Sequence, residues 1–133
     1  MPKEAPVMTI IIDDHGTSAR TISNDITDLD FATPRGVQEV TGVDKTAIER
    51  LLLLADFSAT YNGVFNDASN LSHAVFSTIP STSIARTCSH AASGQTLAVE
   101  AFLTDYIMRR ASTGELTWSV PAVLQNGTAP TWS

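Results

Sequence analysis

Three histidines are the residues best suited to bind a metal ion or to transfer a proton. His15 lies in a predicted turn, His73 on a predicted helix and His90 in a predicted strand. No two of them have a spacing such as i and i+4 on one helix, which would bring two imidazoles to one ion. We therefore expect structural or solvent-facing imidazoles, no metal site and no cofactor.

Paired carboxylates are the second group that could do chemistry. Asp13 and Asp14 form part of a DDHG turn, which lacks the alternating oxygen ligands of a calcium-binding loop. Asp28 and Asp30 stand two residues apart, so they share one face of a strand. They could act as a glycosidase-like acid pair, but a solvated acidic face is the interpretation that the pattern favours.

The chain contains no sequence motif that is typical of nucleophilic catalysis. There is no G-x-S-x-G elbow and no glycine-rich phosphate loop. The single cysteine, Cys88, lies within a Thr/Ser/Ala-rich strand, where a thiol usually serves as a small buried hydrophobe. The sequence therefore predicts that the protein is not an enzyme and has no catalytic residues.

A proline interrupts an otherwise regular strand near the end of the chain. In GELTWSVPAVLQNG, the apolar residues Trp118, Val120 and Ala122 alternate with polar ones, as in a half-buried strand. Pro121 has no N–H to donate to a ladder, which confines such a strand to an edge, a bulge or a strand end. We predict an edge strand here, marked by Trp118, Pro121 and Val123.

The elements that must position these residues are mostly strands. A cluster of β-branched residues predicts a strand over 8–13, and loose alternation predicts a second over 19–31, with a bulge near Thr27 or Asp28. Asn70 and Pro80 bracket a short amphipathic helix. The further predicted strands cover 56–66, 82–92, 97–110 and 115–125.

The segment 32–54 is the most unusual part of the chain. Residues 32–43 contain one proline and two glycines without a sustained period, which predicts a long loop, and loops of this length are usually functional or disordered. Residues 44–56 fit a helix capped by Asp44 or an extended strand, and propensity slightly favours the helix.

Composition and charge limit the partners. A chain of 133 residues with 43% hydrophobic residues is the size of one domain with its own core. Fourteen acidic and eight basic residues give a net charge of −6, which argues against a surface that grips nucleic acid. The N-terminus lacks a signal-peptide pattern and the longest aliphatic run is far too short to span a bilayer, so we expect no membrane association and synthesis in a cytoplasm.

The order of motifs along nearly the whole chain resembles one known family. The motifs are an early DDHGT turn, ISNDITDLDF, a long loop with EVTG, FSATYNGVFND, a short helix with SHAVF, SGQTLAVEAFLTDY and GELTWSVPAVLQNG. In this order they are similar to the tail tube (major tail) proteins of long, non-contractile-tailed bacteriophages, particularly those of actinobacteria.

This resemblance implies a mainly β fold, an antiparallel β-sandwich or partly closed barrel with one short flanking helix, in a single domain over residues 1–133. It implies a structural virion protein, made in the host cytoplasm, that forms hexameric rings stacked into a hollow tail tube. DNA would pass through the lumen without specific binding. The tail tip, tape measure and tail terminator proteins are the implied partners. The alternative hypothesis is a β-sandwich binding module, such as a head decoration or receptor-contacting virion protein.

Three groups of residues acquire expected roles from this resemblance. The long loop 32–54 is expected to contact a neighbouring subunit or ring through Arg35, Val37, Glu39, Val40, Thr41, Asp44, Ile48, Leu51 and Leu53. The edge strand with Trp118, Pro121 and Val123 is expected to meet a neighbouring subunit, although an ordinary solvent-facing edge fits the sequence equally well. The lumen is expected to carry Asp25, Asp28, Asp30 and Asp105, whose charge would repel DNA phosphates.

Overall fold

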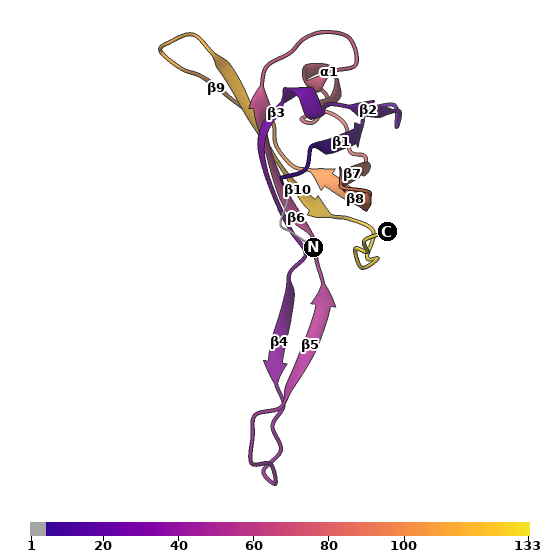
Figure 1. Ribbon diagram of the computed structural model, residues 1–133, viewed down its shortest axis with the longest axis vertical. Helices are drawn as coiled ribbons and strands as arrows, with labels where there is room; N and C mark the ends of the chain where they lie inside the picture. Colours follow the sequence, from indigo (N-terminus) through magenta and orange to yellow (C-terminus); the bar gives the residue numbers. More distant parts are fainter. Residues whose placement is uncertain (1–4) are drawn as a thin grey trace.

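The computed structural model describes residues 5–133 and is built mainly from antiparallel strands (Figure 1). The strands are β1 (Met8–Asp13), β2 (Ala19–Thr21), β3 (Ile26–Ala32), β4 (Arg35–Glu39), β5 (Arg50–Ala55), β6 (Ser58–Val64), β7 (Arg86–Ala92), β8 (Gln95–Leu103), β9 (Ile107–Arg110) and β10 (Leu116–Leu124). A 3-10 turn, η1 (Ser23–Asp25), and one α-helix, α1 (Ser72–Phe76), complete the elements.

One eight-stranded sheet forms the body of the molecule. Its strands follow the order β2-β1-β7-β8-β10-β6-β3, and β9 pairs with the part of β10 that β8 does not reach. The sheet bends over the core without closing, and α1 lies against it near one end (Figure 1). The predicted mainly β sandwich with one short helix is confirmed.

The core follows from the period-two alternation of the strands. In β6 and β10 every second side chain is buried, which brings Tyr61 of β6 opposite Val120 of β10 on the inner face. The bulge predicted near Thr27 is confirmed, since the β3–β6 register shifts between Ile26 and Asp28. The fully enclosed aromatic and aliphatic side chains include Ile10, Ile12, Ile22, Phe57, Tyr61, Val75, Phe76, Leu97 and Val120.

The C-terminal strand is central, so the prediction of an edge strand was wrong. β10 pairs with β6 on one side and with β9 and β8 on the other, and Trp118 is 2% exposed. Pro121 is tolerated because the strands on one side of β10 are interrupted opposite this residue, between β8 and β9. The carbonyl of Pro121 accepts a hydrogen bond from the Thr104 amide (3.1 Å), in the gap between β8 and β9, so no ladder bond is lost there.

The segment 32–54 contains two strands, which corrects the prediction of a long loop over 32–43 and decides the open choice between helix and strand in favour of a strand from residue 50. β4 and β5 form a separate two-stranded hairpin with Val37 opposite Leu52 and Glu39 opposite Arg50. Residues 50–55 are therefore extended, since pairing with β4 outweighs the weak helix preference of the leucines.

Asp25 is buried, so it has no access to a lumen, contrary to the prediction for this residue. Its side chain is 2% exposed and accepts hydrogen bonds from the Asn66 amide nitrogen (2.9 Å) and the Ser72 backbone N–H (3.1 Å). The second bond satisfies a free N–H at the start of α1. Asn70 makes no such cap, because it adopts a positive φ of 64° one residue before the N-cap position.

His90 is a neutral imidazole in the middle of the core. Its Nδ1 lies 3.1 Å from the Leu97 carbonyl, which can only accept, so Nδ1 carries the proton and Nε2 accepts from the Tyr61 hydroxyl (2.5 Å). Phe31 and Tyr61 both stack with the ring. Burial lowers the pKa of His90, because a second proton would place a charge in an apolar core.

This burial predicts a loss of stability at mildly acidic pH. Below the ordinary histidine pKa of 6.5, this histidine binds a proton in the unfolded chain but stays neutral in the folded protein. The free energy of unfolding therefore falls as pH decreases toward the lowered pKa of folded His90. The slope for one proton reaches at most about 1.4 kcal/mol per pH unit. Urea titrations between about pH 7.5 and 5.5 should show this slope in the wild type and a shallower one in His90→Gln. Equal slopes would contradict the assignment.

Gly63 provides a second prediction, because its α-carbon is packed against two other chain segments. A Cβ at this position would lie 2.2 Å from the Asp25 carbonyl oxygen and 2.5 Å from Cζ2 of Trp118. We expect Gly63→Ala to reduce the free energy of unfolding by roughly 2–3 kcal/mol, as overpacking does. At Gly16 a Cβ would meet its nearest atom at 3.5 Å, so Gly16→Ala is the matched control and should change stability by less than about 0.5 kcal/mol in the same urea titration.

Candidate interaction surface

The β4–β5 hairpin projects away from the body, continuing the line of β3 and β6 (Figure 1). Of residues 33–54 only Thr41 is even partly buried. Its exposed apolar side chains are Val37, Val40, Val43, Ile48, Leu51, Leu52, Leu53 and Leu54. Apolar side chains gathered in this way on one exposed element are typical of an interaction site.

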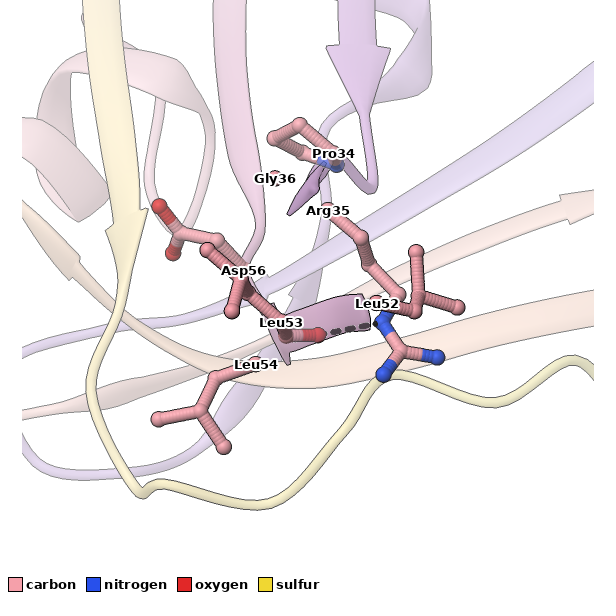
Figure 2. Close-up of a pocket in the computed structure, with 7 residues that line it drawn as sticks. All are labelled: Pro34, Arg35, Gly36, Leu52, Leu53, Leu54 and Asp56. Atoms are coloured by element: carbon pink, nitrogen blue, oxygen red, sulfur yellow. Dashed lines mark hydrogen bonds between the residues drawn. The ribbon is translucent and has the colours of Figure 1, made fainter. Parts of the chain in front are cut away.

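The hairpin holds its shape through its own hydrogen bonds. The Arg35 Nε donates to the Leu53 carbonyl (2.8 Å) across an irregularity in the β4–β5 register, as Figure 2 shows. Nearer the tip, the Val40 amide donates to the Glu49 carbonyl (2.9 Å) and the Glu49 amide donates to the Thr41 hydroxyl (2.9 Å). The apolar residues are therefore presented on an ordered ribbon.

A groove lies at the base of the hairpin, where it leaves the body (Figure 2). Its volume is about 710 Å³. Leucine side chains dominate its lining, and Arg35 and Asp56 add one charge of each sign. The lining residues are Pro34, Arg35, Gly36, Leu52, Leu53, Leu54 and Asp56.

Three strands of the body, β2, β3 and β9, have one margin without a partner strand within residues 5–133. β9, β10, β6 and β3 are neighbours in this order, so β9 and β3 form the two margins of a four-stranded region. Each pairing in this region is antiparallel, and the strand directions alternate across it. Margins of this kind are templates for pairing with another chain.

The outer face of this four-stranded region, opposite the core, carries polar and acidic side chains together with exposed Val64, Ile107 and Val123. Asp28 pairs in register with Asn62, which pairs in turn with Ser119, so these three side chains share that face. Asp30 is two residues from Asp28 on the same face, and both are exposed. Arg109, exposed on β9, lies opposite Thr117 and shares this face at the other margin.

The predicted site residues are thus distributed over separate places. Asp28, Asp30 and exposed Asp105 are on the surface, Asp105 in the segment between β8 and β9, whereas Asp25 and Trp118 are buried. Val123 is 42% exposed on the outer face. The predicted contact residues of segment 32–54 all lie on the hairpin or its tip, and all but Thr41 are exposed: Arg35, Val37, Glu39, Val40, Thr41, Asp44, Ile48, Leu51 and Leu53.

Sequence reasoning missed part of this surface. Leu52, Leu54 and Val43 belong to the exposed hairpin, and the run of four leucines was the signal that could have found the first two, although such a run does not show which face each leucine is on. Ile107 and Arg109 were missed because residues 97–110 read as one continuous strand, and only the pairing of β9 with β10 separates them from β8.

The candidate metal-binding side chains do not come together in the described part of the chain. Among residues 5–133, no group of three or more His, Cys, Asp or Glu side chains could hold a metal ion. The Nδ1 of His73 contacts the Tyr106 hydroxyl (3.2 Å), within an aromatic cluster. In the same residues no helix has both the length and the apolar character needed to cross a membrane.

Comparisons with solved structures identify the fold. A chain from the tail of an empty GTA particle with C6 symmetry matches with a TM-score of 0.77 at 14% identity, covering 99% of each chain. A chain from the virion of a native gene transfer agent (GTA) particle matches with a TM-score of 0.70 at 15% identity, over 93% of this chain and 95% of that one. A chain from the PVC sheath/tube terminator of an extracellular contractile injection system, in its extended state, gives 0.72 at 9% identity, over 100% and 97%.

These likenesses show that the chain has a fold found in the tails of such particles. No protein-family model matches the chain, and no curated protein matches its sequence.

The geometry of the hairpin predicts that the body folds without it. Ala32 and Ser58 are in register at the last pair of β3 and β6, so replacing residues 34–56 by Asn-Gly would join Thr33 to Phe57 through a two-residue turn. Because the excised residues contribute nothing to the buried core, the free energy of unfolding should change by less than about 1 kcal/mol in urea titrations. A large loss of stability would show that the hairpin supports the body.

Proposed function

We propose that this protein is a structural virion protein whose copies join side by side into rings, and that these rings stack into a hollow tail tube that conducts DNA. The observation that carries the proposal is the arrangement of its unpartnered surfaces. Two free strand margins lie on opposite sides of the β9–β10–β6–β3 region, and an apolar hairpin extends from the end of the same strands. Lateral and axial contacts thus have separate surfaces.

Lateral joining is supported by strand direction. Four strands that alternate in direction give β3 and β9 opposite directions. A rotation about an axis running along the strands keeps those directions, so β3 of one copy meets β9 of the next as an antiparallel pair. A head-to-tail contact of this kind forms a ring when the rotation closes, and closure removes the free margins.

Charge also favours this pairing. Asp28 and Asp30 lie at the β3 margin and Arg109 at the β9 margin, on the same outer face. In a joined sheet, the carboxylates of one copy would lie beside the guanidinium of the next. Opposite charges across strands stabilise a pair by about 0.2–1 kcal/mol, and the gain repeats at each joint of the ring.

The lumen is assigned by exclusion. The inner face of the four-stranded region is covered by the core, so the outer face is the one that can line a hole. It carries Asp28 and Asp30 among polar and apolar side chains, with Arg109 at the β9 margin and Asp105 beyond the end of β8. Carboxylates repel the phosphate backbone, which would let DNA move through without specific binding.

Stacking is assigned to the hairpin. About ten residues separate its base from its tip, so at about 3.3 Å per residue it reaches roughly 30 Å beyond the body. That is enough to contact a subunit of the next ring. The C6 symmetry of the GTA tail supports six copies per ring, and the tail tip, tape measure and tail terminator proteins are the proposed partners in a virion tail assembled in the host cytoplasm.

Electron microscopy of the purified protein tests the proposal. Negative-stain images at increasing protein concentration should show rings and hollow filaments for the wild type. The variant with residues 34–56 replaced by Asn-Gly should give no filaments and at most single rings, because it lacks the axial contact. A wild type that stays monomeric at high concentration and physiological salt would contradict the proposal, and binding to capsids or glycans without filaments would favour the binding-module alternative.

A charge reversal in the same assay separates lateral from axial contacts. Arg109→Asp places a third carboxylate beside Asp28 and Asp30 of the neighbour, and the repulsion repeats at every joint. The concentration needed for rings should rise at least about tenfold, since a loss of 1.4 kcal/mol is a factor of ten. Arg109→Lys keeps the charge and is the matched control. Equal assembly of the Asp and Lys variants would exclude the β3–β9 joint.

A further inference from the structure

Two Asn-Gly pairs occur in the sequence, and the structure places them in different environments. Asn62-Gly63 lies within β6, in the sheet, whereas Asn126-Gly127 lies in the exposed segment that follows β10. An asparagine followed by glycine can modify itself, because glycine has no side chain to hinder the approach of its backbone nitrogen to the asparagine side chain. The two pairs therefore provide a comparison within one chain.

The reaction needs only water. The backbone nitrogen of the glycine bonds to Cγ of the asparagine and gives up its proton, while the Cγ–Nδ2 bond breaks and the side-chain amide leaves as ammonia. Water then opens the resulting succinimide ring at either carbonyl. The product is aspartate or isoaspartate, and in isoaspartate the main chain runs through the side chain and is longer by a methylene group.

The backbone around Asn126 suits this reaction. Within residues 5–133 no hydrogen bond holds the Gly127 amide, and Gly127 has a φ of 71°, which glycine adopts without strain. The Thr128 amide donates a hydrogen bond to Oδ1 of Asn126 (3.1 Å). This oxygen gains negative charge when the nitrogen adds to Cγ, so a donor already aimed at it stabilises the transition state.

The sheet hinders the same reaction at Asn62. The Phe65 amide donates to the Leu116 carbonyl (3.0 Å), and hydrogen-bonded pairs alternate along an antiparallel ladder, so Gly63 bonds in the same way to Trp118, its partner in the register. The Gly63 nitrogen can reach the Asn62 side chain only after this part of the ladder opens. The fold thus protects one Asn-Gly pair and leaves the other free to react.

Asn126 also belongs to a segment that covers a margin of the sheet. We call residues 125–133 the C-terminal strap. The strap leaves β10 and returns to β8, where Thr96 and Ser133 exchange two backbone hydrogen bonds (3.0 and 2.8 Å). These bonds hold the end of the chain against a part of β8 that β10 does not reach.

The products of the reaction would weaken this contact. The strap and the sheet enclose a groove of about 150 Å³, and Glu100 is the only charged residue among the described residues that line it together with Asn126. A carboxylate at position 126 would be repelled by that of Glu100. In isoaspartate, the additional methylene group would also shift the strap along β8, so that Ser133 no longer meets Thr96 in register.

We propose that Asn126 is a site of spontaneous deamidation, and that its modification releases the C-terminal strap from β8. The inference is independent of the proposed function, since it needs only the folded chain and water. Release frees the covered part of the β8 margin, and such a margin is a template for another strand. The released fraction increases with the age of the protein, because the ammonia is lost.

Mass spectrometry after timed incubation tests the site. The folded protein is kept in dilute, mildly alkaline buffer, and peptic digestion at low pH stops the reaction. Asn126 should be modified at least about tenfold faster than Asn62, because only Asn62 requires the ladder to open. In urea the two rates should agree within about threefold, since neither pair is then protected. Equal rates in the folded protein, or an Asn126 that reacts only in urea, would overturn the proposal.

Hydrogen exchange followed by NMR tests the release of the strap. Asn126→Asp carries the charge of the product, and Asn126→Gln is the neutral control, because its longer side chain closes the ring much less readily. The Thr96 and Ser133 amides should exchange at least about threefold faster in the Asp variant than in the Gln variant. In aged wild type, the fraction of chains with fast exchange should equal the modified fraction. Exchange that is the same in both variants and unchanged by ageing would show that the strap stays bound and would overturn its release.

Discussion

Backbone hydrogen bonding at the strand margins is the constraint on which the organisation of this molecule depends. Each N–H and C=O along β3 and β9 needs a partner, and within the described chain only one side of each strand has one. Water can satisfy the other side. A strand from a second copy would satisfy that side with a fixed register and direction. An even number of strands that alternate in direction gives the two margins opposite directions, so neighbouring copies can pair as antiparallel strands around the proposed ring.

The body achieves rigidity through a few buried polar contacts and does not need a long helix. Arg86, 2% exposed, donates hydrogen bonds to the Val75 carbonyl and to the Thr78 hydroxyl (3.0 Å), and its pKa is lowered by burial. Asp25 holds the other end of α1 through the Ser72 amide. These bonds attach a helix of five residues to the sheet, although a helix of that length is marginal alone.

The hairpin differs from the body, since it exposes its apolar residues and buries none. A two-stranded ribbon is marginal by itself in water, and the bonds of Arg35 and Thr41 help to keep it extended. Such a segment exposes a large apolar area, and the charge of −6 on the rest of the chain opposes unspecific association. The neutral hairpin and the acidic body thus favour contact between different surfaces over contact between like ones.

The sequence by itself determined the class of fold, because alternation in segments such as 56–66 reflects which side chains face the core and is a local property. It also located the bulge near Thr27 and set segment 32–54 apart from the regular strands of the body, where the structure has a separate hairpin. Tertiary structure alone decided the place of Pro121, since the break between β8 and β9 that accommodates it comes from another part of the chain. It likewise decided the role of Asp25. The local sequence does not distinguish an exposed carboxylate on a strand from one buried beneath a helix, and only folding brings Ser72 and Asn66 to Asp25.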